Sequence, residues 1–267
     1  MLIRRFIWVT VLAVLLVSGV NSQPNFRSQE IRSSGFSLNL NWLQLTDNTF
    51  SPLRYNGPGI DLRILSVRDY NQMRRHLQIG ARGDYLWNRL DFTSYYFQPS
   101  FIWGLTFLIP DLSADNASSF FGGSLNATSR IYRFNNEDPE RIYWTTSYSL
   151  DLNYLFDLEI NRDRFMFVEI RVPVAAAVSR PSDEINYTYQ LPGFGEYIKR
   201  LHENIGFATL DKLQSANLKI IMDLSRSRRS SFSIGYEVDF FRFAGTEQVM
   251  YLSNSLLLRM YIDALVW

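Results

Sequence analysis

Residues 232–240 read FSIGYEVDF, a run in which large apolar side chains alternate with polar or small ones at every position. A period of two is that of a β-strand with two different faces. Glu237 and Asp239 place two charges near the middle of the polar face. This pattern favours a strand with an apolar environment on one side and an enclosed polar space on the other.

Nine further segments alternate in the same way, at residues 36–42, 60–64, 77–87, 97–109, 121–131, 144–154, 166–176, 216–224 and 256–264. Most of them reach the roughly 9–11 residues that cross a bilayer when tilted, whereas globular strands average about 5–6. Together they predict an all-β chain forming a transmembrane, antiparallel, up-and-down β-barrel of about ten strands (roughly 8–12).

Soluble β-sandwiches and lipocalin-like barrels also alternate and are the competing interpretation. Aromatic residues near the predicted strand ends favour the membrane barrel, because such residues form girdles at the two bilayer interfaces. The candidates for these girdles are Trp42, Tyr85, Trp87, Phe97, Trp144, Tyr154 and Phe240.

Residues 1–22 read MLIRRFIWVTVLAVLLVSGVNS. Arg4 and Arg5 precede an apolar run, and Val20 and Ser22 supply small residues at the −3 and −1 positions of a cleavage site. This order predicts a secretory signal peptide at 1–22, followed by a single barrel domain at 23–267. A membrane anchor is the alternative, but the run is short for about 30 Å of hydrocarbon.

Composition excludes several classes of function. The chain has 27 basic and 26 acidic residues, so bulk charge gives no reason to expect a nucleic-acid partner. It has no cysteine, which excludes a disulfide scaffold, a thiolate metal site and a cysteine nucleophile. The mean hydropathy of −0.12 is typical of a soluble protein. In a barrel, however, apolar outward residues and polar inward residues alternate, so an apolar exterior is compatible with such a mean.

A secretory leader, the absence of cysteine, an even number of strands and the final aromatic Trp267 make the chain resemble a bacterial outer-membrane β-barrel protein. The resemblance is to the class and involves no family-specific motif. It implies an outer-membrane location, membrane lipids as partners and both termini in the periplasm. One feature departs from the class: Trp267 is out of phase with the apolar face of Leu258, Met260 and Ile262.

This topology predicts periplasmic turns at 71–76, 110–119, 157–164 and 225–230, and outer loops at 43–58, 88–95, 133–142, 179–213 and 242–250. The longest connection falls on the outer side, as in other barrels of this class. Gly57-Pro58-Gly59 is read as part of a turn in the first outer loop.

Eight acids and six bases fall on the predicted inner face: Asp61, Arg63, Arg82, Asp84, Arg130, Asp151, Glu169, Arg171, Lys219, Asp223, Glu237, Asp239, Arg259 and Asp263. A barrel of about eight strands is filled by its own side chains, while water-filled porins need 16–18. We therefore expect a largely closed lumen whose charges pair with each other. A narrow solute path and a catalytic site are the alternatives.

The chain has two histidines and no catalytic constellation around either. His76 is predicted in a periplasmic turn and His202 in an outer loop as a solvated side chain. Metal-ligand spacing is absent, so we expect no metal and no cofactor.

The longest outer segment, 180–215, contains apolar residues at helical spacing: Phe194, Tyr197, Ile198, Leu201 and Ile205. They predict a short amphipathic helix over 194–205, between Gly193 and Gly206. Its apolar face could cap the lumen, rest on the outer leaflet or dock another envelope protein.

The sequence thus predicts a non-enzymatic outer-membrane barrel that acts as an interaction or accessory component of an envelope complex through its outer loops. A narrow channel or a conduit for lipid or small solutes is the alternative function. A lipid-modifying enzyme or protease of the outer membrane is the third.

Overall fold

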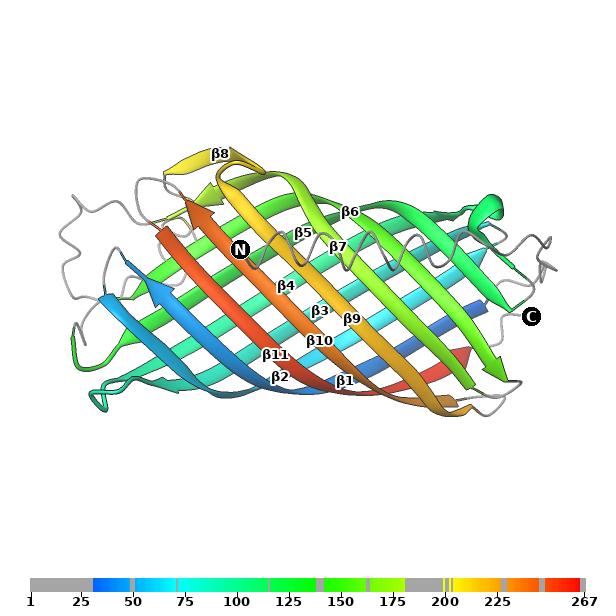
Figure 1. Ribbon diagram of the computed structural model, residues 1–267, viewed down its shortest axis with the longest axis horizontal. Helices are drawn as coiled ribbons and strands as arrows, with labels where there is room; N and C mark the ends of the chain where they lie inside the picture. The colour runs from blue at the N-terminus through cyan, green and yellow to red at the C-terminus, as the bar shows by residue number, and fades with distance from the viewer. Residues whose placement is uncertain are drawn as a thin grey trace.

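The computed structural model shows a closed barrel of ten antiparallel strands with one short additional strand (Figure 1). It describes residues 31–48, 51–70, 72–114, 116–137, 142–161, 164–180, 199, 202, 204–226, 230–244 and 248–264. The strands are β1 (Ile31–Asp47), β2 (Ser51–Tyr70), β3 (Met73–Trp87), β4 (Thr93–Leu108), β5 (Ala117–Phe134), β6 (Tyr143–Asn161), β7 (Arg164–Ser179), β8 (Ile205–Thr209), β9 (Leu213–Arg226), β10 (Ser230–Ala244) and β11 (Gln248–Ala264), with a 3-10 turn η1 (Pro110–Leu112) before β5.

The ten barrel strands follow each other in sequence order, and β1 closes the barrel against β11. Leu38, for example, lies opposite Leu62 of β2 on one side and Leu258 of β11 on the other. The predicted fold class, an up-and-down antiparallel barrel of about ten strands, is confirmed. In the described part of the chain, no helix combines the length and the apolar character needed to span a membrane.

The barrel has two distinct ends. We call the end where β1 begins and β11 ends the terminal end, and the opposite end, where β1 passes into β2, the distal end. In Figure 1 the strands run obliquely along the long axis between these ends.

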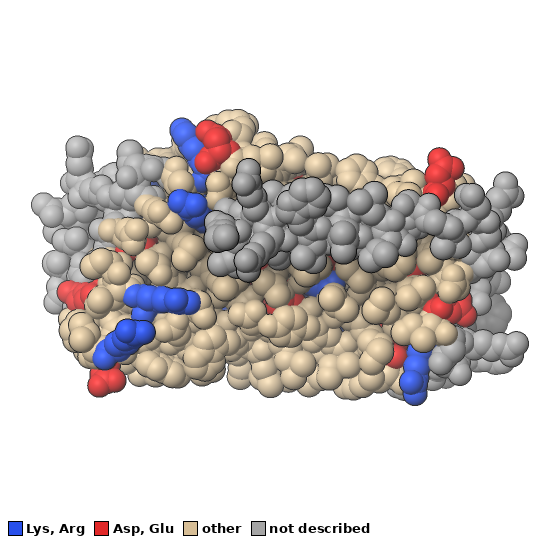
Figure 2. All heavy atoms as spheres, in the orientation of Figure 1, with Lys and Arg blue, Asp and Glu red and all other residues tan. Residues whose placement is uncertain are grey.

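Polarity in the middle of the barrel is the reverse of that in a soluble protein. On β2 the outward-facing Ile60, Leu62 and Ile64 are 54%, 59% and 68% exposed, while the inward-facing Ser37 and Asn39 of β1 are fully buried. On the face shown in Figure 2, charged side chains gather mainly towards the two ends. An apolar band around a polar interior is the pattern that a bilayer requires of a barrel.

The predicted outer loop at 43–58 is wrong, because β1 continues to Asp47 and β2 begins at Ser51. Gly57-Pro58-Gly59 accordingly lies inside β2 and not in a turn. At Gly57 an added Cβ would lie 2.0 Å from the carbonyl oxygen of Tyr85, so glycine here permits the close approach of β3.

Two predicted periplasmic turns are also shorter than expected. β3 begins at Met73, which places His76 within a strand, and β6 continues to Asn161, which places Asp157 within a strand. Polar and charged residues near these strand ends suggested turns. They face the lumen instead, where polar side chains are expected in a strand of this class.

The predicted outer loop at 179–213 contains a strand. Residues 205–209 form β8 and pair with residues 175–179 of β7, whereas residues 217–222 of β9 pair with residues 166–171 of the same strand. Both β8 and β9 run antiparallel to β7, so together they resemble one barrel strand interrupted by residues 210–212. Ile205 begins this strand, which corrects its assignment to a helix.

Most predicted girdle aromatics face outward. Trp42, Tyr85, Trp87 and Phe97 are between 38% and 49% exposed. Trp144 does not fit this pattern, since only 4% of it is exposed.

Candidate functional site: the barrel lumen

An apolar cluster fills the lumen at the distal end. We call it the distal plug, and its buried members are Leu43, Leu45, Tyr55, Leu86, Tyr96, Tyr132, Phe134, Tyr143, Ala176, Val178, Ala208, Leu213, Phe241, Val249 and Tyr251. They come from every barrel strand and from β8. Apolar side chains thus converge from the whole circumference at this level.

The aromatic rings of the plug pack against each other. Tyr132 of β5 stacks on Tyr143 of β6 with 6.1 Å between ring centres. The ring centres of Tyr55 of β2 and Phe134 of β5 are 4.9 Å apart, and these two rings are tilted to each other. At the distal edge, the Tyr132 hydroxyl donates to Asp47, and Arg180 donates to both carboxylate oxygens of Asp47 at 3.0 and 2.8 Å. Ring packing therefore stabilises the plug, and the buried ion pair of Arg180 and Asp47 stabilises its distal edge.

The sequence carries a signal for this plug that the period-two analysis missed. Outward-facing Trp42 is followed directly by inward-facing Leu43, so the apolar side of β1 changes face at this point. Beyond it the outward positions are polar, as at Gln44 and Thr46. Polar outside and apolar inside is the arrangement of a barrel in water. The distal part of the barrel thus has the surface of a segment that extends beyond the bilayer.

A layer of charged side chains fills the middle of the lumen. Arg63 of β2 contacts Glu237 of β10 at 2.7 Å, past the two intervening strands β1 and β11, and also donates to Asp61 at 2.7 Å. Lys219 lies 3.2 Å from Glu169 and 3.8 Å from Glu237. These alternating charges form one connected network of ion pairs.

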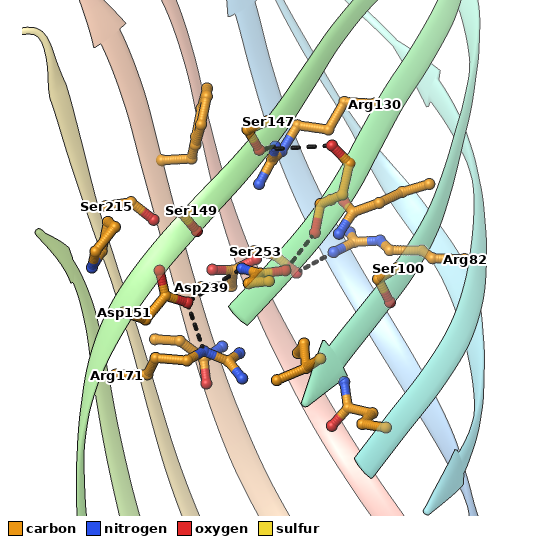
Figure 3. Close-up of a pocket in the computed structure, with 18 of the residues that line it drawn as sticks. Arg82, Ser100, Arg130, Ser147, Ser149, Asp151, Arg171, Ser215, Asp239 and Ser253 are labelled. Atoms are coloured by element: carbon orange, nitrogen blue, oxygen red, sulfur yellow. Dashed lines mark hydrogen bonds and ion pairs between the residues drawn. The ribbon is translucent and has the colours of Figure 1, made fainter. Parts of the chain in front are cut away.

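Figure 3 shows part of this layer, where side chains from different strands point towards each other. Arg82 donates to Asp84 at 2.6 and 2.8 Å and to Ser253 at 2.8 Å. Arg171 lies 3.7 Å from Asp151. The free space among these groups is about 50 Å³, room for a few water molecules.

Arg130 joins the charged layer to the distal plug. Its guanidinium donates to Ser147 at 3.0 Å and to the Tyr251 hydroxyl at 2.8 Å, and that hydroxyl donates to Asp239 at 2.7 Å. The same guanidinium lies 4.0 Å from the centre of the Phe241 ring, a cation–π contact.

The structure places thirteen of the fourteen predicted lumen charges inside the barrel; the side chain of Asp263 lies outside the described part of the chain. Twelve of the thirteen take part in the contacts above or, for Asp223, in a 2.6 Å hydrogen bond from Ser233. Arg259 is the exception and lines the space described next.

A cavity of about 400 Å³ occupies the lumen at the terminal end. We call it the terminal cavity. Apolar side chains of several strands form much of its wall: Leu65, Val67, Leu155, Phe165, Phe167 and Ile221. Near its edge, Arg74 contacts Asp69 and Asp157, both at 2.7 Å, and lies over the Phe120 ring.

Both histidines lie in surroundings that the sequence did not predict. His76 lines the terminal cavity and packs against Gly104 of β4, where an added Cβ would lie 2.1 Å from its Cε1. His202 is not merely solvated, because its ring stacks on Tyr148 of β6 and Nε2 hydrogen-bonds to the Tyr148 hydroxyl. The two histidines therefore belong to separate sites.

The remaining sequence-predicted features are placed as follows. Within the described ranges, no group of three or more His, Asp or Glu residues is arranged to hold a metal ion. Of the predicted helix over 194–205, Phe194, Tyr197, Ile198 and Leu201 lie outside the described residues, as do the predicted signal peptide at 1–22 and Trp267.

An apolar outer band, a polar interior and a closed ring of antiparallel strands define this protein as a transmembrane β-barrel of the outer-membrane class. No protein-family model matches the sequence, and no curated protein matches it.

Several solved structures are similar in architecture. The outer-membrane protease OmpT from Escherichia coli shares 5% identity over 90% of this chain and 98% of its own, with a TM-score of 0.49. The translocator domain of the autotransporter NalP from Neisseria meningitidis shares 8% over 97% and 95%, with a TM-score of 0.45. Neisserial surface protein A shares 10% over 86% and 96%, with a TM-score of 0.32. At these identities the similarity concerns barrel architecture and not activity.

Proposed function

We propose that the protein is a non-conducting, non-enzymatic barrel that serves as an interaction or accessory component of an outer-membrane complex and acts through its distal surface. The distal plug is the observation that supports this most directly. Fifteen buried side chains close the lumen at that level, and the charged layer beneath them leaves about 50 Å³. A solute path would have to cross both.

In this proposal the signal peptide at 1–22 is removed, both termini face the periplasm and the distal end faces outward. The connection between β7 and β8 then starts and ends on the outer side, since Ser179 and Ile205 are paired at the distal end. Loops longer than about 15 residues are usually either functional or disordered or linker segments, and the proposal takes the first reading. We assign partner contact to this connection, residues 181–204.

Conductance in planar bilayers tests the closed lumen. The purified full chain should give no discrete openings, because the plug and the charged layer both have to open before ions pass. Heat-modifiable gel migration of the same sample shows that the inserted protein is the folded barrel. Regular openings from folded protein would overturn the proposal in favour of the channel alternative.

Replacing the proposed contact segment tests the partner. Because Ser179 pairs with Ile205, a loop of about four Gly and Ser residues can close this hairpin in place of 182–202. Arg180 is retained, since it holds Asp47. In-cell cross-linking should recover one envelope protein with the native chain and lose it with this variant. A matched variant that shortens the β5–β6 connection at 136–141 should retain that protein, and equal recovery from both variants would contradict the proposal.

A further inference from the structure

From the side chains around the terminal cavity, we infer that it is a binding site for a small amphipathic anion, with the acidic group held by Arg259 and the hydrocarbon part against the apolar wall. The role is additional to the proposed use of the distal surface and does not depend on it. The charged layer and the plug lie on the distal side of the cavity.

The size and lining of the cavity suit a small ligand. Its volume of about 400 Å³ falls within the roughly 300–1,000 Å³ of ligand pockets. Val67 of β2 faces into it, and so do Phe167 of β7 and Ile221 of β9, which lie opposite each other on two paired strands. In barrels of this class the inner face is normally polar, so apolar residues at inward positions call for an explanation other than membrane contact.

Arg259 supplies the positive charge for binding the acidic group of the ligand. The residue is 7% exposed, and its Nε has no hydrogen-bond partner within the described part of the chain. None of the ion pairs formed among the described residues includes its guanidinium. A buried guanidinium is costly unless an anion or a hydrogen-bond acceptor reaches it. A carboxylate or similar group fits this position, because arginine has five donors and no acceptor.

The acids around the cavity do not meet this need, because most are already engaged. Glu169, whose charge also acts on Arg259, is contacted by Lys219 at 3.2 Å and by Arg171 at 3.7 Å. Arg74 contacts both Asp69 and Asp157, and Asp223 accepts a hydrogen bond from Ser233 at 2.6 Å. A cationic ligand would have to compete with these arginines and lysine.

His76 provides a second polar group on the same wall. Both ring nitrogens are buried, and neither has a hydrogen-bond partner among the described residues. One of them carries a proton in the neutral ring and can donate to a ligand oxygen. Apolar walls with two unsatisfied polar side chains favour an amphipathic ligand over a purely apolar one.

Sodium octanoate is a suitable probe, because it is anionic, short and monomeric at millimolar concentration. Titration calorimetry of the full chain in nanodiscs, with empty nanodiscs subtracted, should show one saturable site. Octylamine, which has the same chain and the opposite charge, should show none. Equal binding of the two, or no saturable octanoate binding, would overturn the inference.

Two variants locate the site. Arg259→Gln should weaken octanoate binding about tenfold or more, the usual effect of removing a charge-assisted hydrogen bond. Val67→Trp should abolish binding by filling the cavity while retaining Arg259. Arg242→Gln, at the distal end, is the matched control and should bind as the native chain does. Unchanged affinity in folded Arg259→Gln and Val67→Trp proteins would place the octanoate elsewhere and refute the site.

A second measurement on the native chain covers the case in which Arg259→Gln does not fold. A diazirine derivative of octanoic acid should cross-link to peptides of β2, β7 or β9 that line the terminal cavity. Labels found only on the outer surface of the barrel would show that the probe partitions into lipid and would refute the inference.

Discussion

The guanidinium of Arg130 on β5 lies 4.0 Å from the centre of the Phe241 ring on β10, on the other side of the lumen. Tyr251 of β11 faces the same guanidinium at 4.7 Å. These contacts make the boundary between the charged layer and the distal plug continuous, so neither layer can move without disturbing the other.

The Phe241→Ala, Tyr251→Ala double variant should open the lumen. Each truncation removes a ring from the plug and also a contact of Arg130 in the charged layer, so both barriers are disturbed. Loss of a buried aromatic side chain costs about 3–5 kcal/mol, so folding must be checked by gel migration. Single-channel recordings should show openings that the native chain lacks. Phe232→Ala, on the outward face of the same β10 strand, is the control and should stay silent. A silent double variant would show that the charged layer alone seals the barrel.

Arg63→Met should destabilise the barrel strongly. It leaves Asp61 without a cationic partner and Glu237 with Lys219 at 3.8 Å alone, and breaking a buried ion pair from one side costs about 3–5 kcal/mol. Arg68→Met is the matched control, because Arg68 lies on the same strand with an exposed side chain. Urea unfolding in lipid vesicles, followed by tryptophan fluorescence, measures the difference. Equal unfolding midpoints would mean that the network adds no stability.

A charge on the apolar band should be costly in proportion to its depth in the membrane. Leu62 lies near the middle of β2 and Tyr70 at its terminal end, and both face outward. Leu62→Arg should cost about 2–4 kcal/mol and Tyr70→Arg about 0–1 kcal/mol. The fraction folded into phospholipid vesicles reports this difference. Comparable losses at both positions would contradict the assignment of the band to the bilayer.

Gly104→Ala should displace the His76 ring. An ideal Cβ at position 104 would lie 2.1 Å from Cε1 of His76, whereas a Cβ at Gly83 would meet nothing within 4 Å. The chain has two histidines, so ¹³C-histidine NMR resolves each. The His76 signal should move in Gly104→Ala and stay in place in Gly83→Ala, with His202 unchanged in both. An unmoved His76 signal would place its ring away from β4.

The fold could be predicted from the sequence because membrane strands obey a strict local rule. Alternation such as that of residues 232–240 needs no knowledge of the rest of the chain, and it gave the fold class and the strand number. Strand ends were less predictable. A charged residue such as Asp157 is equally typical of a turn and of the luminal face of a strand, so its residue type does not show where the strand ends. Pairing with the neighbouring strand determines that.

The candidate site was less accessible from sequence for a related reason. Alternation places Arg259 and Glu237 on the inner face, but it cannot say that Arg63 reaches Glu237 past two intervening strands. The distal plug had a readable signal in the adjacent apolar pair Trp42-Leu43, which marks the change of face. The terminal cavity had none, because an empty space depends on the sizes of side chains from strands far apart in sequence.

The interruption between β8 and β9 has a mechanical consequence. Where residues 166–171 pair with 217–222, backbone hydrogen bonds run around the full circumference, and the terminal half is a closed hoop. Towards the distal end, β7 pairs with β8, and β8 pairs with no further strand among those described. The ring of backbone hydrogen bonds is therefore interrupted in this half. Side-chain packing must therefore hold β8 to the strands on its other side. Ala208 of β8 and Leu213 of β9 both belong to the distal plug. The plug therefore closes the lumen and also holds together the part of the wall that lacks backbone pairing.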